Sequence, residues 1–431
     1  MRLLITGLLV CLAVSAAMAI AADDPASQVR QNVRGLNSPE LTLREKAEKA
    51  LIDLGPSALP LLPADDARMP AEVIQRLNRI RQTLLKLQVE AGVKTSLVTL
   101  DVKAMPLADA LAALCKQSGN RIVDYREEFG EEPSPIKISL QCDKTPFWQA
   151  LDQLLDQANL DVYNYGADRG IYVISRPTGR LPRQAKVSYS GPFRIAPIRF
   201  EALADLQNPR NRSLKLFLDV SWEPRLRPIN IVQPLAAVQA TGADGAIPVD
   251  GADGEPEVSV GPESTTVELQ LPLESPARKV EKIAALKGRL NALVPGPAEE
   301  FRFAELPLAK NGVEAKRVEQ RKATVTVTVD QVRKNNDVWE LQMRVKFDKP
   351  GEALESHRSW IYDNEAYLED AKGNRILSGG YEQTRQTKDE VGVKYLFDAP
   401  EGIAGQTFVY KTPLAIMELP IDYELTDLPL P

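Results

Sequence analysis

Residues 212–224, RSLKLFLDVSWEP, decide the fold of the larger part of this chain. Leucine, valine and tryptophan alternate with mostly polar residues, and this period of two is typical of a half-buried β-strand. The stretch ends in an aromatic residue, an acid and a proline. Residues 337–350, DVWELQMRVKFDKP, have the same alternation and the same ending. The two stretches indicate two copies of one strand-rich domain.

Three further pairs occur in the same order: AAVQATGADGAI (236–247) with AYLEDAKGNRI (366–376), TTVELQLPLESP (265–276) with VGVKYLFDAPEG (391–402), and EEFRFAELPL (299–308) with PIDYELTDLPL (420–430). The displacements run from 122 residues (308 to 430) to 129 residues (247 to 376). Four matches in register predict a tandem duplication. Many short alternating strands favour two immunoglobulin-like β-sandwich domains, at 187–308 and 309–431.

Residues 95–177 form a different kind of module. SLVTLDVKAM (96–105) predicts a strand, and Pro106 opens an apolar helix, PLADALAALCKQSGN. A short strand, NRIVDY, and an alternating strand, PIKISLQC, follow. TPFWQALDQLLDQANL (145–160) predicts a second helix that begins at a proline, and a final hairpin ends at Pro177. This order predicts a small α+β domain in which two helices cover one face of one sheet.

This block resembles the short N-terminal domain shared by secretins and TonB-dependent receptors. The resemblance rests on V-x-A-M-P-L-x-D-A-L-A-A-L, on its echo K-T-P-F-W-Q-A-L-D-Q-L-L-D-Q-A-N-L, and on Ile171-Tyr172-Val173-Ile174, about one-fifth of the chain. It implies a periplasmic interaction module without catalysis. The chain carries no downstream barrel or secretin region, so passage through an outer membrane is not implied.

Residues 26–92 are predicted to be helical. R-x-x-A-x-x-x-L-x-x-L-G-P-x-A-L-P-x-L resembles one HEAT-type repeat, and a second helix with an apolar stripe starts near Pro70. This second helix is basic, which indicates either a contact with an anionic surface or a solvated face. The chain is thus expected to be an α+β multidomain protein, with a proline-punctuated linker at 178–186.

The first 21 residues read as a cleaved signal peptide, with one arginine, an apolar run and A-x-A patterns. We therefore expect a periplasmic or secreted protein. The rest of the chain has no stretch apolar enough to span a bilayer. The formal net charge of −6 gives no general attraction to nucleic acid.

Two cysteines remain after cleavage, Cys115 and Cys142. In an exported chain this pair is a candidate disulfide, and two buried thiols that never meet are the alternative. The sequence has no C-x-x-C motif and only one histidine, so it predicts no zinc or redox site. Asp244, Asp250 and Asp253 lie in a glycine-rich stretch (241–257), but their spacing is not that of an EF-hand, and a solvated loop is the alternative to calcium binding.

The single histidine lies in ESHRSWIYDNEAYLED (355–370). The first predicted domain has no counterpart of the N-terminal half of this stretch, so the fold does not require these residues. Either it is a local packing plug, in which Arg358 pairs with a carboxylate and Trp360 covers one end of the domain, or it is a recognition loop formed by Glu355, His357, Arg358 and Trp360. SHRSW also resembles a motif of uncharacterised bacterial exported proteins, which implies no activity.

No catalytic constellation is recognisable: one histidine without a G-x-S-x-G elbow does not predict a Ser-His-Asp triad, and Gly-rich phosphate loops are absent. We expect no enzyme, no catalytic residue and no cofactor. The predicted function is an exported binding or scaffold protein of the bacterial envelope whose partner is an envelope protein or a cell-wall polymer. The alternative is a secreted carboxylate-dependent hydrolase such as a glycosidase, with Glu355, Asp363 and Glu365 as candidate acids.

Overall fold

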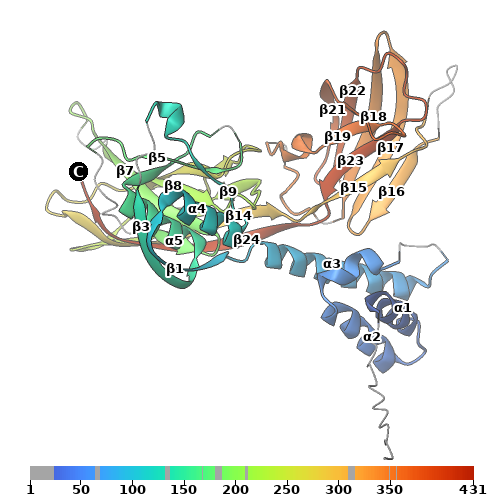
Figure 1. Cartoon of the computed structure of the whole chain (residues 1–431), viewed down its shortest axis with the longest axis horizontal. Helices are drawn as coiled ribbons and strands as arrows, with labels where there is room; N and C mark the ends of the chain where they lie inside the picture. The colour runs from blue at the N-terminus through green and yellow to red at the C-terminus, as the bar shows by residue number, and fades with distance from the viewer. Residues whose placement is uncertain are drawn as a thin grey trace, which may run out of the picture. The chain divides into compact units, whose positions relative to one another are not determined.

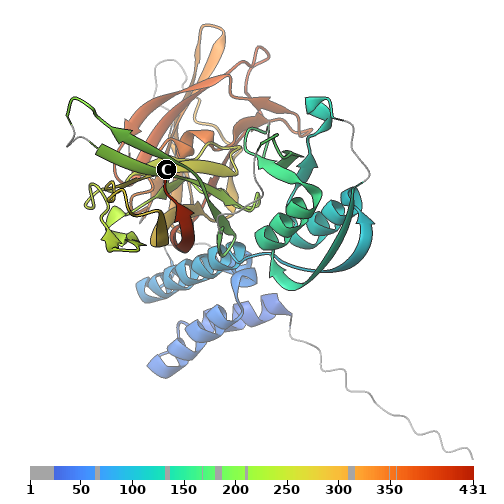
Figure 2. The ribbon, with the colours of Figure 1, turned by 90° about the vertical axis from the view of Figure 1, so that its left-hand side faces the viewer.

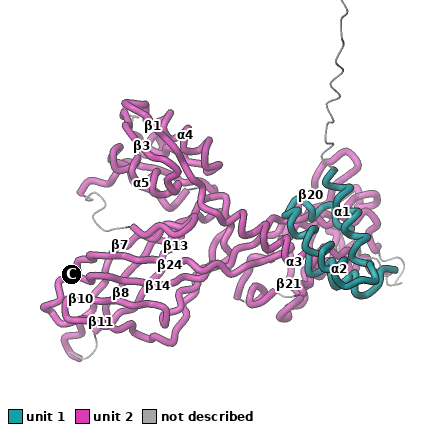
Figure 3. The backbone as a smooth tube through the Cα atoms, turned by 90° about the horizontal axis from the view of Figure 1, so that it is seen from below, with its two compact units in different colours: residues 1–80 teal, residues 81–431 magenta. Residues whose placement is uncertain are grey.

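The computed structural model describes residues 24–431 except 64–67, 132–135, 167, 180–186, 209–211, 309–315, 349 and 356. It is a mixed α and β protein with more strand than helix and several antiparallel sheets. The chain divides into two compact units, residues 1–80 and 81–431 (Figure 3). The predicted signal peptide and residues 180–186 of the predicted linker lie outside the described residues.

The first unit is helical, as predicted for residues 26–92. Its elements are α1 (Pro25–Gly35), α2 (Leu41–Asp53), η1 (Pro56–Leu61) and the start of α3 (Ala71–Gly92). Gly35 lets α1 approach α2 closely, because a Cβ at this position would lie 2.9 Å from the Cβ of Ala47. The left-handed Gly55 then separates α2 from η1.

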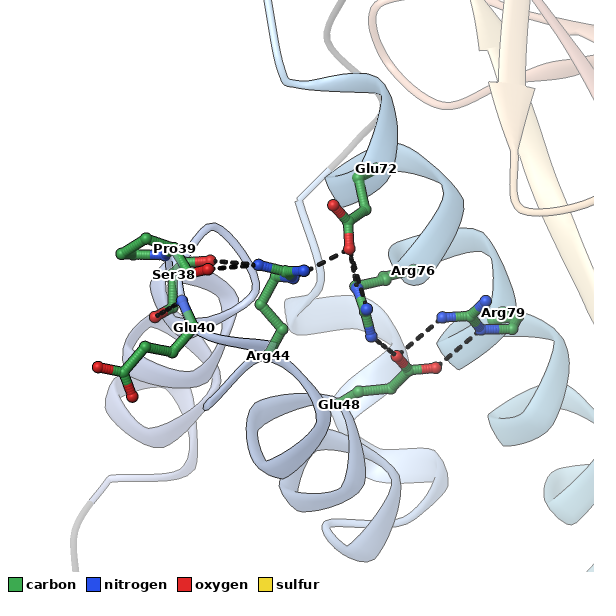
Figure 4. Close-up of polar contacts among 8 residues, drawn as sticks. All are labelled: Ser38, Pro39, Glu40, Arg44, Glu48, Glu72, Arg76 and Arg79. Carbon is green, nitrogen blue, oxygen red and sulfur yellow. Dashed lines mark hydrogen bonds and ion pairs between the residues drawn. The ribbon is translucent and has the colours of Figure 1, made fainter. Parts of the chain in front are cut away.

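Ion pairs join α2 to the start of α3 (Figure 4). The Arg76 guanidinium lies 2.6 Å from Glu48 and 2.9 Å from Glu72, and Arg79 Nε lies 2.8 Å from Glu48. Hydrogen bonds from Arg79 lower the pKa of Glu48. Two arginines of the predicted basic helix therefore bind carboxylates of their own unit, and one of them, Arg79, remains 59% exposed to solvent.

In the second unit the rest of α3 is followed by the α+β module, in the element order that the sequence predicts. Its elements are β1 (Leu97–Pro106), α4 (Leu107–Ser118), β2 (Ile122–Asp124), η2 (Glu127–Phe129), β3 (Lys137–Pro146), α5 (Phe147–Ala158), β4 (Leu160–Tyr163) and β5 (Ile171–Ser175). The helices α4 and α5 lie side by side (Figure 2). The strands form two sheets, β1-β3 and β2-β5-β4, so the prediction of one sheet is wrong. Both sheets and both helices contribute to one core.

The pair β1-β3 is internally symmetric, which explains the two similar helix starts. Ala104 and Lys144, each two residues before a proline, have φ of 50° and 45°. The N–H of Leu107 donates to Ile136 O, and the N–H of Phe147 donates to Ser96 O, both at 2.9 Å. Each strand thus leads straight into its helix, with the first helical N–H satisfied by the residue just before the partner strand.

The first β-module contains two sheets over one hydrophobic core. One sheet has the order β13-β8-β7-β6, and the other has β11-β10-β14-β9-β12, with β24 on the free edge of β14. The elements are β6 (Ser188–Ser190), β7 (Phe193–Ala204), β8 (Arg212–Trp222), β9 (Asn230–Val232), η3 (Leu235–Ala237), β10 (Gln239–Gly242), β11 (Gly245–Ile247), β12 (Glu257–Ser259), β13 (Thr266–Leu273), β14 (Lys282–Pro295) and β24 (Ile416–Pro429).

The second β-module also contains two antiparallel sheets, β16-β17-β18-β22-β21 and β15-β23-β19-β20. Phe408 of β23 packs against Phe397 and Tyr395 of β22, so the two sheets share a core. The elements are β15 (Ala298–Phe303), β16 (Val318–Lys322), β17 (Val325–Asn335), β18 (Val338–Phe347), η4 (Trp360–Asp363), β19 (Ala366–Glu369), β20 (Arg375–Leu377), β21 (Gly380–Gln386), β22 (Glu390–Phe397) and β23 (Thr407–Pro413).

The two β-modules have matching strand orders. The order β13-β8-β7-β6 of the first corresponds to β22-β18-β17-β16 of the second, and β11-β10-β14-β24 corresponds to β20-β19-β23-β15. Each pair of stretches matched in the sequence occupies equivalent places in these orders. The last pair, β15 and β24, is exchanged: each strand completes the sheet of the other module.

The exchange corrects the predicted boundary between residues 308 and 309. β14 pairs with β24 from Lys282↔Pro429 to Pro295↔Ile416, and β15 pairs with β23 from Ala298↔Pro413 onward (Figure 1). The N–H of Gly296 donates to Ala415 O at 2.8 Å between these ladders. One two-stranded ribbon therefore runs through both modules, and the first module consists of residues from about 187 to 295 together with the C-terminal strand.

Candidate functional site

The stretch predicted as a plug or a recognition loop lies between the two β-modules. Arg358, only 5% exposed, donates from Nε to Glu257 Oε1 at 2.9 Å and from Nη2 to Oε2 at 2.7 Å. Glu257 belongs to β12 of the first module and also accepts from Asn230 Nδ2 at 2.7 Å. The Arg358 hydrogen bond is the main reason that the pKa of Glu257 falls to about 2. A two-point ion pair of this kind fixes orientation as well as distance.

Trp360 and Arg358 have the contacts expected of a packing plug. Trp360 Nε1 donates to Ala353 O at 2.6 Å, and its ring lies edge-to-face against Phe347 with centroids 6.0 Å apart. Glu355 and His357 are exposed, with His357 Nε2 3.3 Å from Glu257 Oε1. The four residues predicted to act together thus have two different roles. Arg358 and Trp360 hold the loop in place, and Glu355 and His357 remain on the surface.

A cavity of about 720 Å³ lies where the ribbon crosses from one β-module to the other. We call it the junction cavity. It is lined by the end of α3, by Arg169 of the α+β module, by residues 225–229, 260–264 and 294–298 of the first β-module and the crossing, and by residues 360, 363–365, 411 and 413 of the second. Gly296 is required here, because a Cβ would lie 2.9 Å from Val89 Cγ2.

The cations of the junction cavity differ in their partners. Arg225 donates to the carbonyl oxygens of Gly92 and Lys94, and Lys411 Nζ lies 3.0 Å from Glu365. Arg169 Nε is buried without a hydrogen bond and lies 3.6 Å from Glu263.

Arg227 makes no hydrogen bond or ion pair with any residue that the structure describes. Removal of water from around its guanidinium, and then the like charge of Arg169, lower the pKa of Arg227.

Two of the three acids proposed for a hydrolase line this cavity. Asp363 and Glu365 face it, whereas Glu355 is not part of its lining. Burial raises the pKa of Asp363.

A surface group of aromatic residues on the α+β module was missed in the sequence. Tyr125 contacts Phe129, Tyr163 and Tyr172 at centroid distances of 5.9, 6.0 and 5.1 Å, and Tyr163 contacts Tyr165 at 5.5 Å. We call these five residues the aromatic face. Phe129 is 54% exposed and Tyr165 82% exposed. The signal was present in YNY (163–165), but strand pairing is needed to bring Tyr125 and Phe129 beside it.

Buried charges tie the α+β module to the first β-module, and these were also missed. Glu223 is fully buried and accepts from Ser96 N at 2.9 Å, Asn120 Nδ2 at 2.9 Å and Arg225 Nε at 3.0 Å. Arg194 Nε donates to Asp152 at 2.8 Å. Burial opposes the charge of Arg194, but the carboxylates of Asp152 and Asp219 outweigh this effect and raise its pKa.

Both remaining cysteines are free in the structure, without the disulfide considered above. Cys115 is half-buried on α4, and Cys142 is buried on β3, where its thiol lies 3.8 Å from Val98 O. Cys142 belongs to the core of the α+β module, where it packs as a small apolar side chain.

The described part of the chain contains no group of His, Cys, Asp and Glu suited to a metal ion. The aspartate stretch is not one long loop: β10 and β11 form a hairpin in it, and Asp244 pairs with Lys279 at 3.1 Å.

Comparisons with known proteins do not indicate a function for this chain. No family model, no curated protein and no solved structure matches the chain. Among the described residues, no helix is both long and apolar enough to cross a membrane. A functional assignment therefore depends on the aromatic face, the junction cavity and the loop around Arg358.

Proposed function

We propose that the protein is an exported binding or scaffold protein of the bacterial envelope that acts without catalysis. Its α+β module, which resembles the short N-terminal domain of secretins and TonB-dependent receptors, serves as an interaction module. Its two immunoglobulin-like β-sandwiches have the same role. The N-terminal pattern of residues 1–21 supports export to the periplasm or beyond. The buried ties of Glu223 and Asp152 support a fixed attachment of the α+β module to its neighbour.

The observation that carries this proposal is the aromatic face. Exposed aromatic rings that stack on one another offer a large contact area at a small cost in side-chain entropy, and such residues are enriched at binding interfaces. Phe129 and Tyr165 form its exposed rim, whereas Tyr172 is buried beneath. We assign the face to an envelope protein, because Tyr125, Phe129 and Tyr163 form an apolar surface that a protein partner would bury.

Binding to a detergent-solubilised envelope fraction tests the proposal. The wild-type protein is expected to retain a specific protein, and the double variant Phe129→Ser/Tyr165→Ser is expected to lose at least tenfold in retention. Tyr381→Ser is the matched control, since Tyr381 is an exposed ring that stacks on Tyr362 in the second β-module. Equal retention by the double variant and the control, or retention of wall polymer in place of protein, would overturn this assignment.

One observation favours the hydrolase alternative. Asp363, whose pKa is raised by burial, shares the junction cavity with Glu365 and Glu263. Two carboxyl groups that face one cavity are the minimum that glycoside hydrolysis requires. This alternative predicts release of reducing ends from purified wall glycan by the wild type and none by Asp363→Asn. If the wild type releases no reducing ends, the hydrolase alternative is wrong.

A further inference from the structure

The junction cavity has walls suited to an apolar body. Its lining includes Pro228, Pro262, Pro297, Pro413, Val260 and Trp360. A cavity of about 720 Å³ lies within the range of small-ligand pockets, which are mostly apolar with a few polar groups that orient the ligand. The walls come from both β-modules and from the crossing of the ribbon. The cavity therefore exists only in the complete second unit.

The polar groups of this cavity leave one cation without a partner. Lys411 binds Glu365, and Arg225 binds backbone carbonyls, but Arg227 contacts no acceptor among the described residues. Arg169 Nε is buried and forms no hydrogen bond, because Glu263 lies 3.6 Å away. Arginine donors are strong and geometrically rigid, and an unsatisfied buried donor such as Arg169 Nε is costly. The side chain of Arg227 is exposed, so its donors are open to a ligand.

The electrostatics favour an added negative charge. Loss of water from around the guanidinium, and then the like charge of Arg169, oppose the charge of Arg227 and lower its pKa. Glu263 and Glu365 of the lining favour the charge of Arg227, but they are engaged by Arg169 and Lys411 and do not outweigh these two effects. An anion between the two arginines would relieve their repulsion and satisfy the free donors.

We propose that the junction cavity binds a small ligand that carries one anionic group, a carboxylate or a phosphate, on an apolar body. Arg227 and Arg169 hold the anionic group, and the proline-rich wall beside Trp360 holds the body. This site is separate from the aromatic face, so the two proposals stand or fall independently.

Calorimetric titration of the mature protein tests the site. The probes are benzoate, phenyl phosphate and the neutral benzyl alcohol. At least one anionic probe is expected to bind tenfold or more tightly than benzyl alcohol, and binding should weaken as salt is added. The stronger of the two anionic probes distinguishes a carboxylate site from a phosphate site. Equal affinity for all three probes, or no binding of either anion, would refute the proposal.

Two variants connect binding to the assigned arginine. Arg227→Gln is expected to lower the affinity for the better anion at least tenfold without altering the melting temperature, because Arg227 pairs with no residue that the structure describes. Arg289→Gln, which removes an exposed arginine paired with Asp422, is expected to bind as the wild type does. Should Arg227→Gln fold poorly, Arg227→Lys keeps the charge and is expected to retain part of the affinity. Unchanged binding in a folded Arg227 variant contradicts the assignment.

Discussion

At the scale of single residues, the contact between Glu257 and Arg358 explains the unusual stretch around the only histidine. The first β-module supplies the carboxylate and the second supplies the guanidinium. A partly buried pair with several hydrogen bonds is costly to break from one side, because the remaining charge keeps its desolvation without its partner. His357, beside them, is exposed and approaches the same carboxylate. The ion pair therefore accounts for the buried position of Arg358, whereas His357 is a surface group.

This pair predicts a stability that depends on pH. The pKa of Glu257 is about 2 in the folded protein, below the ordinary value of 4.5, so its stabilising effect is complete above about pH 4.5 and is lost as the pH falls toward 2. At pH 6, Glu257→Gln is expected to lower the free energy of unfolding by about 1–2 kcal/mol, after allowance for solvent screening.

Urea unfolding at a series of pH values measures this effect. The difference between wild type and Glu257→Gln should narrow toward pH 2.5. Glu401→Gln, at an exposed position, is the control and should follow the wild type throughout. A constant difference across the pH range would show that the carboxylate charge is not what Arg358 requires.

At the scale of elements, the exchange of β15 and β24 is the main feature of the β-modules. Gly296 and Pro297 separate β14 from β15, and Leu414 and Ala415 separate β23 from β24. Gly296 is absent from the glycines with positive φ, so the chain continues through it in place of the tight hairpin turn that would return β15 to β14. The four strands consequently join end to end as one ribbon.

A core residue of β24 therefore determines the stability of the first β-module. Leu425 is fully buried, is paired with Leu286 of β14, and belongs to the core of that module. Leu425→Ala is expected to lower the free energy of unfolding by about 2–5 kcal/mol, as reported by Trp222 of that module. Glu424→Ala, its exposed neighbour, should cost less than about 1 kcal/mol. If Leu425→Ala lowers the free energy of unfolding reported by Trp339 and leaves the value reported by Trp222 unchanged, β24 belongs to the second module.

At the scale of the whole molecule, the shared ribbon couples the two β-modules. Each module lacks an edge strand unless the other part of the chain is folded, because β15 and β24 come from the opposite side of the crossing. Independent tandem domains would be joined by a single connection with few contacts. The two β-modules are instead expected to fold and unfold as one cooperative structure.

Fluorine NMR of the protein labelled with 5-fluorotryptophan tests this coupling during a urea titration. Trp222 reports the first module and Trp339 the second, where its Nε1 donates to Ala399 O at 3.2 Å. Both native signals should disappear at the same urea concentration. Two separated transitions would indicate that each module is stable by itself, with the exchanged strands contributing little.

Much of the local structure follows from the sequence alone. Alternating apolar residues identify strands such as β8 and β18, and a proline after an alternating strand marks the starts of α4 and α5, because side-chain periodicity and proline geometry are local properties. The duplication was also visible, since equivalent strands carry similar patterns. The candidate loop could be recognised in the sequence because the first copy lacks it. Its contact could not, because the partner of Arg358 lies about a hundred residues away in the chain.

The tertiary structure alone decides which strand completes which sheet. β15 and β24 have similar sequences, so either could pair with β14 as far as pattern is concerned, and only long-range pairing distinguishes them. For the same reason the division of the α+β module into two sheets, the aromatic face and the junction cavity are absent from any local pattern. Each results from residues that are far apart in the sequence and meet only when the sheets have formed. Composition and periodicity thus determine the elements of this protein, and non-local hydrogen bonding determines its sites.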